Sequence, residues 1–220
     1  MTKKVLIIHY SQTGQLTEIV DSFCEGMQED NIEIDHLKLE PEVPFPFPWT
    51  RLAFFNTFPE SVFGIPMPLK KKDFDHSENY DLVVLAYTVW YMSPSIPINS
   101  FLLSEDGKRI MKGKKVITLI GARNMWVMAQ EKMKTILRDL DSTLVGNIAL
   151  VDRNANLVSI VTVIRWMFYG KTNPFWGFPQ AGILRSDIDS ASTFGNVVQQ
   201  ALCSNELSNV NQYLLDKGAM

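Results

Sequence analysis

The chain has 220 residues and a formal net charge of −3, with 46% hydrophobic and 20% charged residues. This composition is typical of a globular protein with a sizeable core, and it excludes an intrinsically disordered chain. A small net charge without a long basic run does not provide the electrostatic footprint for nucleic acid, so we expect no nucleic-acid partner. We expect a single domain over residues 1–220, because one domain with insertions reaches this length.

The N-terminal residues lead directly into a strand-like run without the pattern of a signal peptide, so we expect a cytoplasmic protein. The longest apolar stretch, Leu157–Phe168, is shorter than the roughly 20 residues that cross a membrane. It predicts a buried helix or an interface, and no membrane span. Cys24 and Cys203 lack CxxC or His spacing, so we expect buried, reduced thiols and no metal site.

Continuous apolar runs predict the strands of a parallel sheet, because such strands are covered by helices on both faces. The stretches between them have helical periodicity. This alternation predicts an α/β fold with a doubly wound five-stranded parallel sheet, in the order 2-1-3-4-5, and a ligand site at the carboxyl ends of the strands. The predicted strands are Val5–His9, Ile32–Leu37, Leu82–Tyr87, Val116–Ile120 and Gly146–Val151.

Apolar stripes at helical spacing predict three helices that pack on this sheet. A further helix between the second and third strands is expected only over Arg51–Phe58, because Pro59 should end it. The three stripes consist of Leu16, Ile19, Val20, Phe23 and Met27; Met125, Met128, Ala129, Met133, Ile136, Leu137 and Leu140; and Ile188, Ala191, Phe194, Val198 and Leu202.

Two aromatic-rich insertions, at about 41–80 and 152–185, interrupt the simple alternation of strands and helices. Segments this long between elements are usually functional. Large exposed apolar patches are rare on monomers, so we expect the insertions to close a homodimer interface that also walls the site. The three consecutive lysines Lys70, Lys71 and Lys72 indicate only a solvated loop.

The loop after the first strand has the composition of a phosphate site. Ser11, Thr13 and Thr17 supply hydroxyl groups, and Gly14 lets the backbone approach a ligand. A helix follows directly, and its unpaired N–H groups and dipole attract phosphate. The alternative is that these Ser and Thr residues merely cap the helix.

Two further loops, which follow the third and fourth strands, are candidates for contact with a flat ring. The first holds Trp90 and Tyr91, which offer stacking area if they are not simply core residues under a loop. The second holds Arg123, which is either a site cation or an exposed ion-pairing residue. His9, at the end of the first strand, is interpreted as a satisfied core histidine rather than a catalyst.

These loops resemble those of the flavodoxin family. In the FMN phosphate loop of that family, Ser or Thr, any residue, Thr, Gly, any residue and Thr follow in order. Ser11, Thr13 and Gly14 match this pattern, whereas Leu16 replaces the last hydroxyl residue and Thr17 comes one position late. The second loop of the family reads Pro-x-aromatic-aromatic-Gly-Ser-Pro. It is similar to residues 88–94, with Thr88 in place of Pro and Met92 in place of Gly.

The resemblance implies a flavodoxin-like fold and FMN as cofactor. It also implies that Arg123 holds negative charge at flavin N1 and O2, and that Asn124 contacts the pyrimidine edge. The implied cofactor-binding residues are Ser11, Gln12, Thr13, Gly14, Gln15, Leu16, Thr17, Thr88, Val89, Trp90, Tyr91, Met92, Ala122, Arg123, Asn124 and Trp126.

Three longer segments, Pro44–Phe58, Gly121–Glu131 and Asp152–Pro179, are similar to flavodoxin-like enzymes associated with dialkylresorcinol biosynthesis. That resemblance implies an aromatase-type flavoenzyme acting on a cyclohexanedione-like intermediate. The main expectation is broader: an FMN-dependent oxidoreductase for a small apolar quinone- or cyclohexanedione-like substrate, reduced by NAD(P)H. A flavodoxin that carries electrons between proteins and a scaffold that has lost FMN remain the alternatives.

Overall fold

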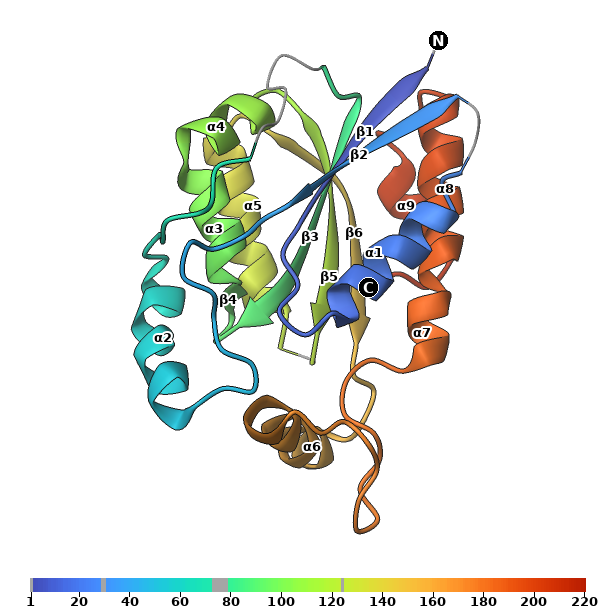
Figure 1. Cartoon of the computed structure of the whole chain (residues 1–220). Coiled ribbons are helices and arrows are strands. Elements are labelled where there is room, and N and C mark those ends of the chain that lie inside the picture. The colour runs from blue at the N-terminus through green and yellow to red at the C-terminus, as the bar shows by residue number, and fades with distance from the viewer. Residues whose placement is uncertain (1, 29–30, 73–78, 124) are drawn as a thin grey trace.

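The computed structural model, which describes residues 2–28, 31–72, 79–123 and 125–220, places a parallel sheet between two layers of helices (Figure 1). The order of the parallel strands is β2-β1-β3-β5-β6. The five predicted strands and their predicted order are therefore confirmed. A short strand, β4 (Ser93–Pro94), forms an antiparallel hairpin with the end of β3. The parallel strands are β1 (Lys3–His9), β2 (Ile32–Lys38), β3 (Leu82–Trp90), β5 (Lys115–Ala122) and β6 (Thr143–Val151).

Helices cover both faces of the sheet, so its strands are buried between two hydrophobic cores (Figure 1). One core contains α1 (Gln15–Glu25), α7 (Arg185–Asp189), α8 (Ala191–Cys203) and α9 (Val210–Asp216). The other contains α3 (Ile96–Leu103), α4 (Glu105–Met111) and α5 (Val127–Asp139). This doubly wound arrangement explains why the strand sequences are apolar without alternation.

The first predicted helical stripe is confirmed, because Leu16, Ile19, Val20 and Phe23 are buried on α1. Met27, the last residue of that stripe, is also buried but lies just beyond the end of the helix. The second stripe is wrong at its start, because Met125 precedes α5 and both Met125 and Met128 are exposed. The third stripe extends over two helices, since the chain leaves α7 at Ser190 before α8 begins.

The helix between β2 and β3 is longer than predicted. Helix α2 (Arg51–Phe63) continues past Pro59 and ends at Gly64, which has a φ of 66°. Pro59 lies on the exposed side of the helix, and tertiary contacts hold the turn that follows it. Ser61 Oγ donates to the carbonyl of Trp90 at 2.9 Å, and Lys132 Nζ donates to the carbonyl of Val62 at 3.3 Å.

Helix α6 (Asn156–Tyr169) contains the longest apolar stretch, and it is not a buried helix. It lies beyond the carboxyl ends of the strands, apart from both helical layers (Figure 1). Within the described ranges, no helix is long and apolar enough to cross a membrane. The prediction of two buried thiols is also wrong, because Cys24 is only partly buried and Cys203 is exposed.

Candidate functional site

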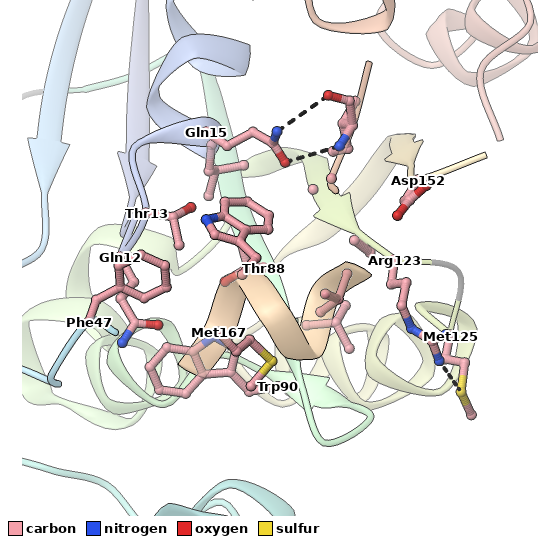
Figure 2. Close-up of a pocket in the computed structure, with 18 of the residues that line it drawn as sticks. Gln12, Thr13, Gln15, Phe47, Thr88, Trp90, Arg123, Met125, Asp152 and Met167 are labelled. Carbon is pink, nitrogen blue, oxygen red and sulfur yellow. Dashed lines mark hydrogen bonds between the residues drawn. The ribbon is translucent and has the colours of Figure 1, made fainter. Parts of the chain in front are cut away.

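A cavity of about 430 Å³ lies at the carboxyl ends of β1, β3, β5 and β6 (Figure 2). This volume is within the range of roughly 300–1,000 Å³ that ligand pockets occupy. The cavity is at the end of the sheet where doubly wound proteins bind their ligands. Its lining includes eleven of the sixteen residues predicted from the sequence: Gln12, Thr13, Gln15, Leu16, Thr88, Val89, Trp90, Tyr91, Met92, Ala122 and Arg123.

The loop between β1 and α1 leaves the start of the helix open. Gly14 has a φ of 91°, and a Cβ atom built at this position would find no atom within 4 Å. The first intrahelical bond joins Glu18 N to the Gly14 carbonyl. Among the described residues, no acceptor satisfies the backbone N–H groups of Gln15, Leu16 and Thr17, and no side chain caps the helix. These three donors and the helix dipole make an anion site.

The side chains of this loop have different roles from those predicted. Ser11 Oγ accepts from Gly14 N at 3.1 Å, so this hydroxyl group shapes the turn. Ser11, Gly14 and Thr17 are not among the residues that line the cavity, whereas Thr13 is both exposed and part of the lining. Thr13 is therefore the hydroxyl side chain of this loop that the cavity reaches.

Two glutamines of the loop between β1 and α1 form hydrogen bonds with the two insertions. Gln12 donates through Nε2 to the carbonyl of Pro46 at 3.0 Å, and its Oε1 accepts from Trp49 Nε1 at 3.2 Å. Gln15 makes two hydrogen bonds of 3.3 Å with the backbone of Ile183, one as donor and one as acceptor (Figure 2). Residues far apart in the sequence thus fix the loop from both sides.

A tight hairpin turn presents the aromatic residues that follow β3. Its two central residues, Tyr91 and Met92, have φ values of 48° and 61°. Both values lie in the left-handed region that glycine favours, so Met92 adopts the backbone conformation that a glycine would adopt there without strain. The hairpin itself is closed by the pairing of Val89 with Pro94 and of Trp90 with Ser93.

Trp90 and Tyr91 contribute both to the cavity wall and to an aromatic cluster beneath it. The ring of Trp90 is 4.8 Å from Phe45 and 5.6 Å from Trp49, measured between centroids. Tyr91 donates its hydroxyl hydrogen to the carbonyl of Phe54 at 2.7 Å. Burial raises the pKa of Tyr91 well above its ordinary value, so its hydroxyl stays protonated.

The loop after β5 brings Arg123 to the cavity, as the sequence predicted. Arg123 donates to the carbonyl of Asn156 at 3.3 Å and contacts Met125 Sδ at 3.5 Å (Figure 2). It forms no ion pair within the part of the chain that the structure describes, so its positive charge is available at the cavity. Trp126 packs against the core instead of lining the cavity. The predicted role of Asn124 lies outside the described residues.

Solved structures of other proteins share this architecture at low sequence identity. A flavoprotein from Lactobacillus acidophilus NCFM, in complex with FMN, matches with a TM-score of 0.53 and 14% identity, over 68% of this chain and 93% of its own. A protein provisionally classed as a flavoprotein, from Bacteroides uniformis ATCC 8492, matches with a TM-score of 0.51 and 17% identity, over 70% and 94%. No protein-family model and no curated protein sequence matches this chain.

The chain has the flavodoxin-like fold. The strand order and the double winding define it, and the similarity to these two solved structures agrees with them. The more particular resemblance to dialkylresorcinol-associated enzymes stays a prediction.

The insertions into the flavodoxin-like fold meet over the cavity, where they supply residues that the sequence did not identify. Trp49 N donates to the carbonyl of Met167 at 2.7 Å. Phe47 and Trp166 meet edge to face, with ring centroids 6.4 Å apart. An indole or phenyl ring at either insertion therefore covers the site. The lining residues from the insertions and from their ends are Phe47, Trp49, Phe54, Asp152, Val163, Trp166, Met167, Gly182 and Ile183.

Asp152 follows β6 and organises the start of the second insertion. Its side chain is buried, with Oδ1 accepting from Asn154 N at 2.9 Å and Oδ2 accepting from Ser159 Oγ at 2.8 Å. The sequence signal for this residue is a carboxylate directly after a strand of a parallel sheet. It holds α6 in position as a wall of the cavity.

His9 does not line the cavity, and the prediction of a satisfied core histidine is only half right. The residue is buried, but neither ring nitrogen has a hydrogen-bond partner among the described residues. Burial lowers the pKa of His9 to about 4, and the neighbouring His36, Lys38 and Lys72 add to this effect. His9 is therefore neutral at physiological pH.

Proposed function

We propose that this protein is an FMN-dependent oxidoreductase for a small, flat, apolar substrate, with NAD(P)H as the source of electrons. The observation that carries the proposal is the cavity itself. It combines unpaired backbone donors at a helix start with aromatic walls contributed by two insertions.

The residues of the cavity fit the cofactor. Gly14 leaves open space where a side chain would block the approach to the helix, and the amides of Gln15, Leu16 and Thr17 suit a phosphate. The flavoprotein from Lactobacillus acidophilus NCFM, which shares the fold, is described in complex with FMN. When bound, FMN supplies reversible redox chemistry that amino-acid side chains lack.

The chain's own residues would orient the ring and exclude water. Trp90 and Trp166 give apolar surface on which a flat heterocycle packs. Arg123 is the free cation at the cavity among the residues described, and it suits the negative charge that a reduced flavin carries. The indole of Trp49 and the thioether of Met167 line the cavity and would exclude water from a ring bound there.

The two insertions favour an enzyme over an electron carrier. A flavodoxin that exchanges electrons with proteins needs an open cofactor edge, and strong acidity is usual because it steers basic partners. Here the insertions contact each other above the cavity, and the net charge is only −3. We therefore propose a quinone- or cyclohexanedione-like ring as the substrate class.

A second candidate is the aromatase-type reaction implied by the resemblance to dialkylresorcinol-associated enzymes. In that reaction an alkylated cyclohexane-1,3-dione loses two hydrogens, as two electrons and two protons, and becomes a resorcinol. The same covered apolar cavity supports it, since both reactions need a flat ring held against a flavin.

Turnover assays separate these functions. In the first assay, FMN-loaded protein receives NADH or NADPH together with a naphthoquinone as electron acceptor. In the second, cytochrome c replaces the naphthoquinone. In the third, the protein receives an alkylcyclohexanedione as substrate and a quinone as electron acceptor. Nicotinamide oxidation that depends on the quinone supports the reductase, and formation of resorcinol supports the aromatase. Reduction of cytochrome c alone contradicts the proposal and favours an electron carrier.

A further inference from the structure

Helix α6 is amphipathic, but its polar face is buried and its apolar face is exposed. Its buried residues Ser159 and Thr162 are polar, and their hydroxyl groups bond to Asp152 and to the helix backbone. The opposite face is an apolar stripe at helical spacing i, i+3, i+4 and i+7. Its side chains Leu157, Ile160, Val161 and Ile164 are 79%, 39%, 40% and 48% exposed. A face with this pattern normally packs against something apolar.

Helix α2 repeats this arrangement at the same end of the molecule. Thr57 and Ser61 are its buried residues, whereas Leu52, Phe55 and Phe63 are exposed. Figure 1 shows α6 below the sheet and α2 beside the lower part of α3, both toward the end where the strands finish. The exposed apolar surface is therefore concentrated at one end of the molecule.

A hairpin next to α6 carries an exposed tryptophan at its tip. Trp176, at 97% exposure, is followed by Gly177 in a turn closed by two hydrogen bonds between Phe175 and Phe178. Arg165 holds the hairpin against α6 by donating to the carbonyl of Asn173 at 2.7 Å. Figure 1 shows this segment extending beyond α6, away from the body of the protein.

The segment that holds α6 and the hairpin has a charge opposite in sign to that of the whole chain. Residues 153–186 contain no Asp or Glu but four basic residues, although the net charge of the protein is −3. Two of the four, Arg153 and Arg185, pair with carboxylates. Within the described ranges, Arg165 and Lys171 pair with none, and the same holds for Arg51 on α2. Two cations without a carboxylate partner among the described residues, Arg165 and Lys171, therefore lie in the same segment as the apolar stripe.

We propose that this end, formed by the apolar stripe of α6 and the Trp176 hairpin, is a docking surface for an anionic lipid bilayer. Amphipathic helices with neighbouring basic residues bind in the plane of the interface, and Trp prefers the headgroup region. A projecting hairpin tip fits a soft bilayer without a matching recess, whereas a second protein would need one. The unpaired cations match the negative charge of such a surface.

The proposed docking surface and the cavity lie on opposite sides of the same helix, α6. Val163, Trp166 and Met167, on the inner side of α6, line the cavity, while Ile160 and Ile164 face outward. One helix thus separates the proposed bilayer contact from the site. In so far as the proposed function holds, docking would place that site beside the phase in which apolar quinone-like rings dissolve. The docking itself does not depend on FMN.

The test is co-sedimentation of the full-length protein with vesicles of phosphatidylcholine alone or mixed with phosphatidylglycerol. Two variants remove exposed apolar groups, Trp176→Ser and the double variant Ile160→Ser/Ile164→Ser. Leu215→Ser, at an exposed apolar position on α9, is the matched control. We expect binding to the anionic vesicles that weakens with salt, about a tenfold loss in each test variant, and no change in the control.

Two results would overturn the proposal. One is absence of wild-type binding to anionic vesicles at low salt. The other is equal binding by wild type and both test variants. The homodimer predicted from the sequence would compete for the same face, so sedimentation velocity is run on all variants. A dimer that dissociates in Ile160→Ser/Ile164→Ser, without vesicle binding, assigns the face to a second copy instead. FMN titration of the same variants separates loss of docking from loss of the cofactor site.

Discussion

Replacing Thr13 by Glu should abolish the preference of the protein for FMN over riboflavin. Thr13 lines the cavity directly before Gly14, next to the unpaired amides that begin α1. A carboxylate at this position would occupy the anion site and repel the phosphate of FMN. Two unit charges about 5 Å apart repel by about 3 kcal/mol at an effective dielectric constant of about 20. This corresponds to about two orders of magnitude in Kd.

The assay is titration of flavin fluorescence with protein, for FMN and for riboflavin separately. Wild type is expected to bind FMN much more tightly, because riboflavin lacks the phosphate. Thr13→Glu should weaken FMN binding and leave riboflavin binding nearly unchanged, and Thr13→Gln, of similar size but uncharged, should retain most FMN affinity. Equal weakening of both flavins, or an unchanged FMN affinity in Thr13→Glu, would refute the placement of the phosphate.

Three further predictions concern the fold around the site. Gln130→Leu strands the buried hydroxyl of Tyr87, which donates to Gln130 Oε1 at 2.6 Å, so urea unfolding should show a loss of about 1–3 kcal/mol that Tyr87→Phe partly restores. Because His9 has its pKa lowered to about 4 in the folded state, the unfolded state binds the proton more tightly, and stability should fall as pH drops from about 6.5 toward 4. His9→Leu should reduce this fall, and an unchanged pH profile would contradict the assignment. Gly182→Ala should lower the free energy of unfolding by about 1 kcal/mol more than Gly177→Ala does. Both glycines have a positive φ, but only a Cβ at Gly182 would lie 2.9 Å from Gln15 Nε2 and 3.0 Å from Trp166. Equal losses of stability in the two variants would contradict this packing.

The strands of the sheet were predictable because the sequence pattern that specifies each of them lies within a few consecutive residues. A strand such as Val83–Leu85 that is covered on both faces must be apolar at every position, and this pattern is visible in a few residues of sequence. The double winding then follows from the alternation with helices, and five strands suit the order 2-1-3-4-5. The loops that hold Thr13, Trp90 and Arg123 could be found because the topology brings the carboxyl ends of the strands together and because the loop sequences resemble those of flavodoxins.

The insertions were not predictable in the same way, because long-range contacts decide their structure. Pro59 normally ends a helix, but the hydrogen bond from Ser61 to the carbonyl of Trp90 holds the turn beyond it. The apolar stripe of α6 predicts burial, and only the structure shows that Ser159 faces inward instead. The ties from Gln12 to Trp49 and from Gln15 to Ile183 join residues that no local pattern relates.

The most direct test of the account is a crystal structure of the protein with FMN. We predict that the phosphate contacts the backbone N–H groups of Gln15, Leu16 and Thr17, and that the flavin ring lies in the cavity between Trp90 and the second insertion. FMN bound away from the start of α1, or a cavity that stays without flavin at saturating FMN, would contradict the central claim.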